Sequence, residues 1–313
     1  MRDMPQVLAE VRSLRRQYGA VLALDDVSFS IRSGEVLGFL GPNGAGKTTA
    51  MQILTGNLAP TSGEVVVNGH DLLAEPKKAK QAMGYLPEQP PLYREHRVDE
   101  FLDYCAALRG IPRRERRAAR ERSKDRCGLK EVGARLIGNL SKGFQQRVGL
   151  AQAIIHAPPV IILDEPTVGL DPIQIREIRA LIREFGKDRA VVLSTHILSE
   201  VEAVCDHVQI INKGRLVLSD TIANVLRRVR SNTLVVRFRT APEIAALEKL
   251  QGVETVQPVD NGRLRIFHQA DVDPTDGVVR LSAERDWGLQ EISPEHGSLE
   301  QLFVQMTETV PTP

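Results

Sequence analysis

Residues 36–55 read VLGFLGPNGAGKTTAMQILT, and this stretch decides the fold class of the chain. Residues 36–40 are apolar and predict a strand, residues 47–55 predict a helix, and residues 41–48 between them match the phosphate-loop pattern GxxxxGK[ST]. Glycines let the backbone fold around an anion, while successive amides and the helix N-terminus point at phosphate oxygens. A glycine-rich turn with an incidental lysine is the weaker interpretation, because chance matches are rare in a chain of this length. The predicted nucleotide-binding residues are Gly41, Pro42, Asn43, Gly44, Ala45, Gly46, Lys47, Thr48 and Thr49.

A second apolar run, VIIL at 160–163, ends in Asp164 and Glu165. Such a run predicts a fully buried strand that delivers both carboxylates at its C-terminal end, where ligands of open α/β sheets gather. Asp164 and the Thr48 hydroxyl are suited to hold Mg²⁺, and Glu165 is placed to polarise the water that attacks a γ-phosphate. An acidic turn before Pro166 is the alternative for these carboxylates taken alone. The phosphate loop upstream favours the catalytic interpretation.

Residues 140–147 read LSKGFQQR, and with this segment the chain resembles the nucleotide-binding subunits of the ATP-binding-cassette (ABC) family. The resemblance covers about residues 6–225, and LSKGFQQR is similar to the family signature LSGGQ followed by QQR. It implies that Ser141 and Gly143 contact the γ-phosphate of ATP bound by a partner subunit. A serine hydroxyl, a glycine and a helix start can form such an anion site. Lys142 departs from the family's glycine and either adds charge near the phosphates or faces solvent.

Two further residues match family landmarks. Tyr18, about thirty residues before the phosphate loop, resembles the aromatic residue that stacks on adenine; a half-buried strand aromatic is the alternative. His196, in LSTH at 193–196, resembles the switch histidine that reaches the γ-phosphate and orients Glu165. A lone histidine is often structural, but its place after another apolar run favours the functional interpretation.

Two loops match the family less closely. VGLD at 168–171 resembles the family's SALD loop, and the resemblance implies that Asp171 communicates between two nucleotide sites. Residues 84–93, GYLPEQPPLY, resemble the Q-loop, although alignment puts Glu88 rather than Gln89 at the usual glutamine position. Both side chains carry oxygens that can contact Mg²⁺ or its water. The sequence leaves open which of the two serves.

Composition excludes several classes of protein. Lys and Arg number 41 against 40 Asp and Glu, so the net charge of +1 gives no field that favours nucleic acid. Three cysteines, Cys105, Cys127 and Cys205, share no metal-ligand spacing and are expected to be small apolar fillers in a reducing cytoplasm. No apolar run approaches the roughly 18 residues that span a bilayer. We therefore expect a soluble chain.

Apolar runs alternating with helical stretches predict an α/β fold class: a P-loop NTPase core with an antiparallel β subdomain and a helical subdomain, plus a small C-terminal α+β domain. The cassette is expected at 6–225, with its helical subdomain at about 91–157, and the accessory domain at 231–313. The expected cassette strands are 7–12, 27–31, 36–40 and 64–68, and the expected helices are 98–108, 112–126 and 220–230.

In the C-terminal domain the expected order is strand 234–238, helix 242–250, hairpin strands 253–259 and 263–267 around Asn261-Gly262, helix 275–285, strand 288–292 and a final helix 298–306. This βαββαβ order predicts a ferredoxin-like fold. It contains no catalytic constellation, so a dimer brace or regulatory module is expected.

Residues 109–126 hold nine Lys or Arg against three acidic residues. A solvated helix face is the simpler interpretation, and contact with anionic lipid headgroups beside a membrane partner is the alternative.

The resemblance implies an ATP- and Mg²⁺-dependent ATPase subunit of an export-type transporter. ATP would bind between Lys47 of one copy and Ser141 of the other, in a dimer that is expected to be a homodimer. The partner would be an integral-membrane permease, which would hold the subunit peripherally at the cytoplasmic face of the cell membrane.

Two alternatives come from other classes. A soluble cassette ATPase acting on ribosomes or nucleic acid is disfavoured, because the chain has one cassette, no sustained heptads and no basic surplus. A regulatory ATP sensor without hydrolysis is disfavoured because Lys47, Asp164, Glu165 and His196 are all present.

Overall fold

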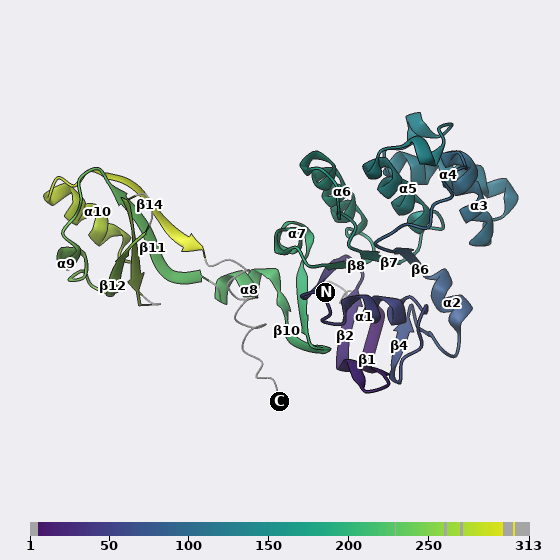
Figure 1. Ribbon diagram of the computed structural model, residues 1–313, viewed down its shortest axis with the longest axis horizontal. Coiled ribbons are helices and arrows are strands. Elements are labelled where there is room, and N and C mark those ends of the chain that lie inside the picture. The colour runs from purple at the N-terminus through teal and green to yellow at the C-terminus, as the bar shows by residue number, and fades with distance from the viewer. Residues whose placement is uncertain (1–5, 229, 260–261, 270–271, 297–302, 304–313) are drawn as a thin grey trace, which may run out of the picture. The chain divides into compact units, whose positions relative to one another are not determined.

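The computed structural model describes residues 6–228, 230–259, 262–269, 272–296 and 303. The chain divides into two compact units, Met1–Ile222 and Ala223–Pro313. The first unit contains two sheets and most of the helices, and the second contains one four-stranded sheet (Figure 1).

A six-stranded sheet, ordered β10-β9-β3-β8-β7-β6, forms the centre of the first unit. Its strands are β3 (Glu35–Leu40), β6 (Met83–Leu86), β7 (Val160–Asp164), β8 (Ala190–Thr195), β9 (His207–Asn212) and β10 (Arg215–Thr221). All neighbours run parallel except β10, which is antiparallel to β9. Every residue of β7 and β8 is buried, as expected for strands covered on both faces. The carboxyl ends of β3, β6, β7 and β8 meet at one edge, where the predicted site residues follow them.

A second sheet, ordered β2-β1-β4-β5, is antiparallel and shares a hydrophobic core with β3 and with the first helix. Its strands are β1 (Val7–Tyr18), β2 (Val21–Arg32), β4 (Ser62–Val67) and β5 (His70–Asp71). The ring of Phe29 packs against that of Phe39 with centroids 5.5 Å apart. Asn68 and Gly69 join β4 to β5 with φ of 49° and 79°, the left-handed pair that a tight hairpin turn requires. This is the predicted antiparallel β subdomain.

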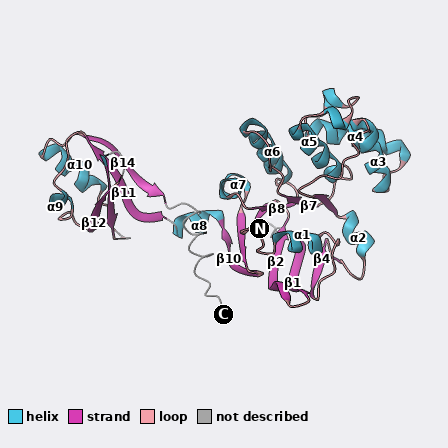
Figure 2. Ribbon diagram, viewed as in Figure 1, coloured by secondary structure: helices cyan, strands magenta, loops and turns pink. Residues whose placement is uncertain are grey.

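Helices follow the strands of the central sheet and also form a separate group. α1 (Lys47–Leu54), α6 (Pro172–Phe185) and α7 (Leu198–Val204) follow β3, β7 and β8 and contact the sheet. α3 (Val98–Leu108), α4 (Arg113–Arg126) and α5 (Lys142–Ile154) pack on one another, with α5 against β6, as Figures 1 and 2 show. The short α2 (Pro76–Gln81) precedes β6, and 3₁₀ turns lie at Lys130–Val132 and Ile137–Asn139.

The basic helix α4 is partly neutralised within the helical group. Arg120 donates to Asp103 at 2.6 Å, and Lys124 donates to Asp99 at 2.6 Å. Lys124 is only 4% exposed. Part of the basic surplus at 109–126 therefore joins α4 to α3 and does not face solvent or lipid.

The second unit has the element order β11 (Arg230–Phe238), α9 (Ile244–Leu247), β12 (Val253–Pro258), β13 (Arg263–His268), α10 (Thr275–Glu284) and β14 (Leu289–His296), preceded by α8 (Ile222–Arg228). The sheet order β12-β13-β11-β14 is antiparallel throughout and confirms the predicted ferredoxin-like arrangement. Val236, Ile266, Val278 and Trp287 lie in its core. The predicted helix 298–306 and the turn residue Asn261 lie outside the described residues, apart from Phe303.

Two helix predictions were too long. The helix predicted at 220–230 begins at Ile222, because Asp220 and Thr221 pair with Val208 and His207 as the end of β10. The helix predicted at 242–250 spans only Ile244–Leu247, and Leu250 closes a turn by donating its amide to the Leu247 carbonyl at 3.1 Å. In both places sheet pairing or a local turn replaced helical bonds.

The three cysteines are unpaired thiols buried in the first unit, as predicted. Burial raises the pKa of Cys105 and of Cys127 to about 12. Within the described part of the chain, no helix has the length and apolar character needed to cross a membrane.

Candidate nucleotide site

The phosphate loop lies between β3 and α1, and two of its glycines adopt conformations that other residues avoid. Gly44 and Gly46 have φ of 77° and 110°, and a Cβ on Gly46 would lie 2.7 Å from the Ala23 carbonyl oxygen. No side chain caps α1, whose first residue is Lys47. The first-turn amides are therefore available to an anion.

Lys47 is buried, with 7% of its surface exposed, and its ammonium donates to the carbonyls of Gly41 at 2.7 Å and Pro42 at 3.3 Å. Burial lowers the pKa of this ammonium group, and three nearby carboxylates act in the opposite direction. These are Glu165, Asp164 and Glu88. The lysine thus faces the carboxylates across the site.

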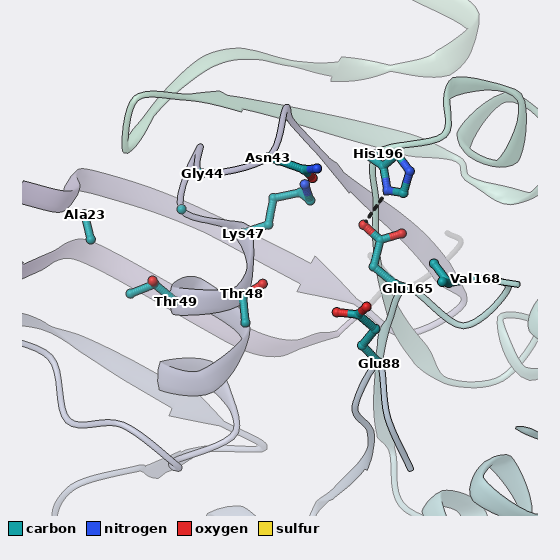
Figure 3. A pocket seen from close by; sticks show the side chains of 11 residues that line it. Ala23, Asn43, Gly44, Lys47, Thr48, Thr49, Glu88, Glu165, Val168 and His196 are labelled. Atoms are coloured by element: carbon teal, nitrogen blue, oxygen red, sulfur yellow. Dashed lines mark hydrogen bonds and ion pairs between the residues drawn. The ribbon is translucent and has the colours of Figure 1, made fainter.

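A cavity of about 310 Å³ opens between the phosphate loop and the ends of β7 and β8. Figure 3 shows Glu165 and Glu88 on the side across from Thr48 and Thr49. Nine of the predicted site residues line the cavity: Asn43, Gly44, Gly46, Lys47, Thr48, Thr49, Glu88, Glu165 and His196. Residues from four separate strand ends therefore meet in one pocket.

Glu165 is held in an unusual backbone conformation. Its φ of 48° lies in the left-handed region, and its amide donates to the Ser194 carbonyl at 2.9 Å. Its Oε1 lies 2.9 Å from Nδ1 of His196, the contact drawn in Figure 3. The Glu165 side chain is nearly buried, whereas that of His196 is 46% exposed. The carboxylate is therefore aimed by its backbone and by one ring nitrogen, as at other strained functional sites.

Asp164 and Thr48, the predicted Mg²⁺ ligands, carry oxygen atoms of the kind that Mg²⁺ binds. Asp164 ends β7 and is 3% exposed, and Thr48 stands in the first turn of α1. Burial raises the pKa of Asp164, and Glu165 and Glu88 act in the same direction. Among the described residues no three His, Cys, Asp or Glu gather into a metal site. One carboxylate and one hydroxyl suit Mg²⁺, which is usually bound by one or two carboxylates together with substrate phosphates.

The cavity distinguishes the two Q-loop candidates. Glu88 lines the phosphate cavity, whereas Gln89 lines a neighbouring cavity of about 570 Å³ together with Lys142 and Gln146. Glu88 also lines that second cavity, so it stands where the two meet. Its position favours Glu88 over Gln89 as the residue near the phosphates.

Comparisons with known proteins agree with this geometry. A family model described as "ABC transporter" matches residues 24–168. The chain is 31% identical over 304 residues to the bacitracin transport ATP-binding protein BcrA of Bacillus licheniformis, and the match covers 96% of this chain and 97% of that protein. The chain belongs to the ABC transporter family. It is an ATP-binding subunit and an ATPase, as predicted.

Two solved structures share the fold of this ABC subunit. The structure of an ATP-binding subunit of an ABC transporter has a TM-score of 0.64 and 32% identity, and the match covers 71% of this chain and 92% of that one. The dimeric structure of MJ0796, a bacterial ABC transporter cassette, has a TM-score of 0.63 and 23% identity, covering 69% and 99%. None of these comparisons favours the ribosome or nucleic-acid alternative.

The ABC signature segment lies against the first turn of α6 and the loop before it in the same chain. Ser141 is the N-cap of α5, and its Oγ accepts the Phe144 amide at 3.4 Å. An added Cβ on Gly143 would lie 2.3 Å from Oε1 of Gln174, and one on Gly169 would lie 2.1 Å from Nζ of Lys142. Ser141 and Gly143 do not line the phosphate cavity of their own chain.

Two other predicted residues of the ABC subunit have local partners. Asp171 is the N-cap of α6, and its Oδ1 accepts the amides of Ile173 at 3.0 Å and Gln174 at 2.9 Å. Tyr18 ends β1, is 44% exposed, and has the Arg16 guanidinium 4.5 Å from its ring centroid. Neither residue lines the phosphate cavity. Adenine stacking by Tyr18 and communication by Asp171 remain predictions.

Several residues near the ABC site were missed from the sequence. Ala23 and Val168 line the cavity, the former from β2. Thr167, Thr195 and Glu200 form a buried group beside Glu165. The one available signal was the position of Glu200 on the apolar face of a short amphipathic helix, next to Val201, where a charged residue is unusual.

Proposed function

We propose that this ABC subunit powers export through a separate membrane permease by ATP-driven closure of a two-subunit dimer. The observation that carries the proposal is that Lys47 lines the phosphate cavity, whereas Ser141 and Gly143 of the same chain do not. A second copy is then required to bring a signature segment to the phosphates. Closure can do work because ATP, held from both sides, binds the closed state better than the open one.

The residues of the cavity supply the hydrolytic step of this proposal. Loop amides and Lys47 hold the phosphates, Glu165 accepts a proton from the attacking water, and His196 keeps the Glu165 carboxylate in place. Thr48 and Asp164 would hold Mg²⁺, which would offset the negative charge of the phosphates.

A role in transport is supported by a relative whose match covers 96% of this chain. That protein is named for bacitracin transport, and its match extends through the second unit of this chain as well as the cassette. We therefore propose a peptide or other drug-like cargo, carried by the permease and not by this chain.

An exposed aromatic surface of the helical group suits docking of the permease. Tyr93 and Tyr104 are 42% and 40% exposed with ring centroids 5.6 Å apart, and Leu108, one turn further along α3, is 68% exposed. Exposed aromatic residues of this kind are enriched in protein interfaces. We propose that this surface binds the integral-membrane permease at the inner face of the cell membrane.

The Glu165→Gln variant tests the catalytic half of the proposal. We expect phosphate release to fall at least about 100-fold, because loss of a general base costs ~10²–10⁴-fold, while ATP still binds and shifts the protein to a dimer on size exclusion. Hydrolysis at the normal rate would remove Glu165 from the role of base.

The partner is tested with the same variant. Tagged Glu165→Gln protein isolated with ATP from mildly solubilised cells is expected to bring an integral-membrane protein with it. The Tyr104→Glu/Leu108→Glu double variant should lose that protein while it still hydrolyses ATP. Recovery of only ribosomes or DNA would contradict the transporter role.

A further inference from the structure

Glu200 is a buried carboxyl group that the chemistry above does not use. It stands on α7, is 1% exposed, and lies four residues after His196. The Thr167 hydroxyl donates to its Oε1, and the Thr195 hydroxyl donates to its Oε2 at 3.0 Å. Both threonines are themselves buried. A carboxyl group placed so deeply needs partners for its oxygens, and here two hydroxyls supply them.

Thr195 connects this carboxyl group to the proposed base. Its Oγ1 lies 3.0 Å from Oε2 of Glu200 and 3.4 Å from Oε2 of Glu165, and it also accepts the Ile197 amide at 3.1 Å. A hydroxyl has one proton to donate. The shorter contact directs that proton to Glu200, which leaves Oε2 of Glu165 without a full hydrogen bond from Thr195.

Thr167 connects the same carboxyl group to the loop after Glu165. The Val168 amide donates to the Glu165 carbonyl at 3.3 Å, and Val168 lines the phosphate cavity. Glu200 thus holds both the loop that leaves β7 and the end of β8, the two segments between which the side chains of Glu165 and His196 meet.

We propose that Glu200 is a positioning residue for ATP hydrolysis. It acts through Thr195, by holding the hydroxyl proton away from Glu165, so that Oε2 of Glu165 stays free to accept a proton from water. The inference rests on the proposed role of Glu165 as the base.

The Glu200→Gln variant keeps the size of the side chain but adds an amide donor. Its NH₂ group can donate to Thr195, whose proton then turns to Glu165. We expect kcat for ATP hydrolysis to fall on the order of tenfold, with the dissociation constant of a fluorescent ATP analogue changed by less than about twofold and an unchanged melting temperature. Glu202→Gln is the matched control, because Glu202 is exposed on the same helix. If kcat falls together with weaker nucleotide binding and a lower melting temperature, Glu200 has a structural role and the proposal is overturned.

Thr195 variants test whether Glu200 acts on Glu165 through Thr195, even if Glu200→Gln folds poorly. Thr195→Ser keeps the hydroxyl and should retain kcat within about threefold, whereas Thr195→Val has no hydroxyl proton to turn to Glu165 and should lose far less kcat than Glu200→Gln does, at unchanged nucleotide affinity. The Glu200→Gln/Thr195→Val double variant should hydrolyse faster than Glu200→Gln alone, because it has no Thr195 proton that could turn to Glu165. A loss of kcat by Thr195→Val as large as that expected of Glu200→Gln, or no recovery in the double variant, would overturn the inference. Normal hydrolysis by Glu165→Gln would instead overturn the proposed base, so the two failures are distinct.

Discussion

At the scale of single residues, the site depends on side chains that several contacts hold in place at once. Glu165 adopts a left-handed backbone conformation and is held by the Ser194 carbonyl and by His196. Left-handed φ in a non-glycine residue costs on the order of 1 kcal/mol or more, and it persists where surrounding contacts fix it. The strain directs the Glu165 carboxylate into the phosphate cavity, across from Lys47.

The two Q-loop residues give a prediction at this scale. Glu88→Ala is expected to lower ATP hydrolysis by roughly tenfold or more, because a carboxylate that faces Lys47 and the phosphate cavity is removed. Gln89→Ala is the control and should change basal hydrolysis by less than about threefold. Steady-state phosphate release by both purified variants checks the prediction, and the reverse order of effects would contradict it.

At the scale of elements, the ends of strands and helices set the geometry of the site. Parallel strands deliver Asp164 and Thr195 to one sheet edge. Ser141 and Asp171 each stand at the N-cap of a helix, and their side chains accept backbone amides there. Ser141, a predicted phosphate contact, and Asp171, a predicted link between two nucleotide sites, thus each also begin a helix.

His156, just after α5, gives a prediction about pH. Its Nε2 donates to the Met83 carbonyl of β6 at 3.1 Å, and its buried Nδ1 has no hydrogen-bond partner among the described residues. Burial, helped by Arg109, lowers the pKa of His156 to about 4, well below its usual 6.5. The native histidine is therefore neutral, and the unfolded chain binds the extra proton between pH 6.5 and 4. Stability is full above pH 6.5 and falls as the pH drops through this window.

Urea unfolding at pH 7 and pH 5 measures this effect. His156 alone should account for roughly 1–2 kcal/mol of the loss in unfolding free energy between these pH values. His156→Gln can still donate to the Met83 carbonyl. Its unfolding free energy should fall by roughly 1–2 kcal/mol less between pH 7 and pH 5 than that of the unsubstituted protein. An equal loss in the variant would show that His156 is not the group responsible.

At the scale of the whole molecule, the proposed ATP site takes its phosphate loop from one copy of the chain and its signature segment from the other. Lys47 lines the phosphate cavity, and Ser141 lies on α5 in the helical group, outside that cavity. In a two-fold symmetric dimer, each signature would meet the phosphate loop of the other copy, and two equivalent sites would form.

Mixing two inactive variants tests this arrangement. Lys47→Ala and Ser141→Arg should each be inactive alone, because each damages both composite sites. In an equal mixture about half of the dimers are mixed, and each mixed dimer keeps one intact site, so about a quarter of the normal hydrolysis should return if the sites act independently. The readout is phosphate release across a titration of one variant into the other. No recovery, with mixed dimers shown to form, would contradict the shared site.

The sequence by itself determined the fold class, the phosphate loop, the strand that ends in Asp164 and Glu165, and the ferredoxin-like order of the second unit. These follow from short patterns, since hydrophobic periodicity and glycine spacing act over a few neighbouring residues. The same local evidence misjudged the helix expected at 220–230, where Asp220 and Thr221 pair with β9 instead.

Only the tertiary structure decided which side chains share the site. Glu88 lines the phosphate cavity and Gln89 does not, and Glu200 reaches Thr167 across 33 positions of sequence. No local pattern reports such meetings, because they depend on the order and register in which β6, β7 and β8 pack side by side. The register between strands decides which residue of each following loop reaches the sheet edge. Register belongs to the packed sheet and cannot be read from any one segment.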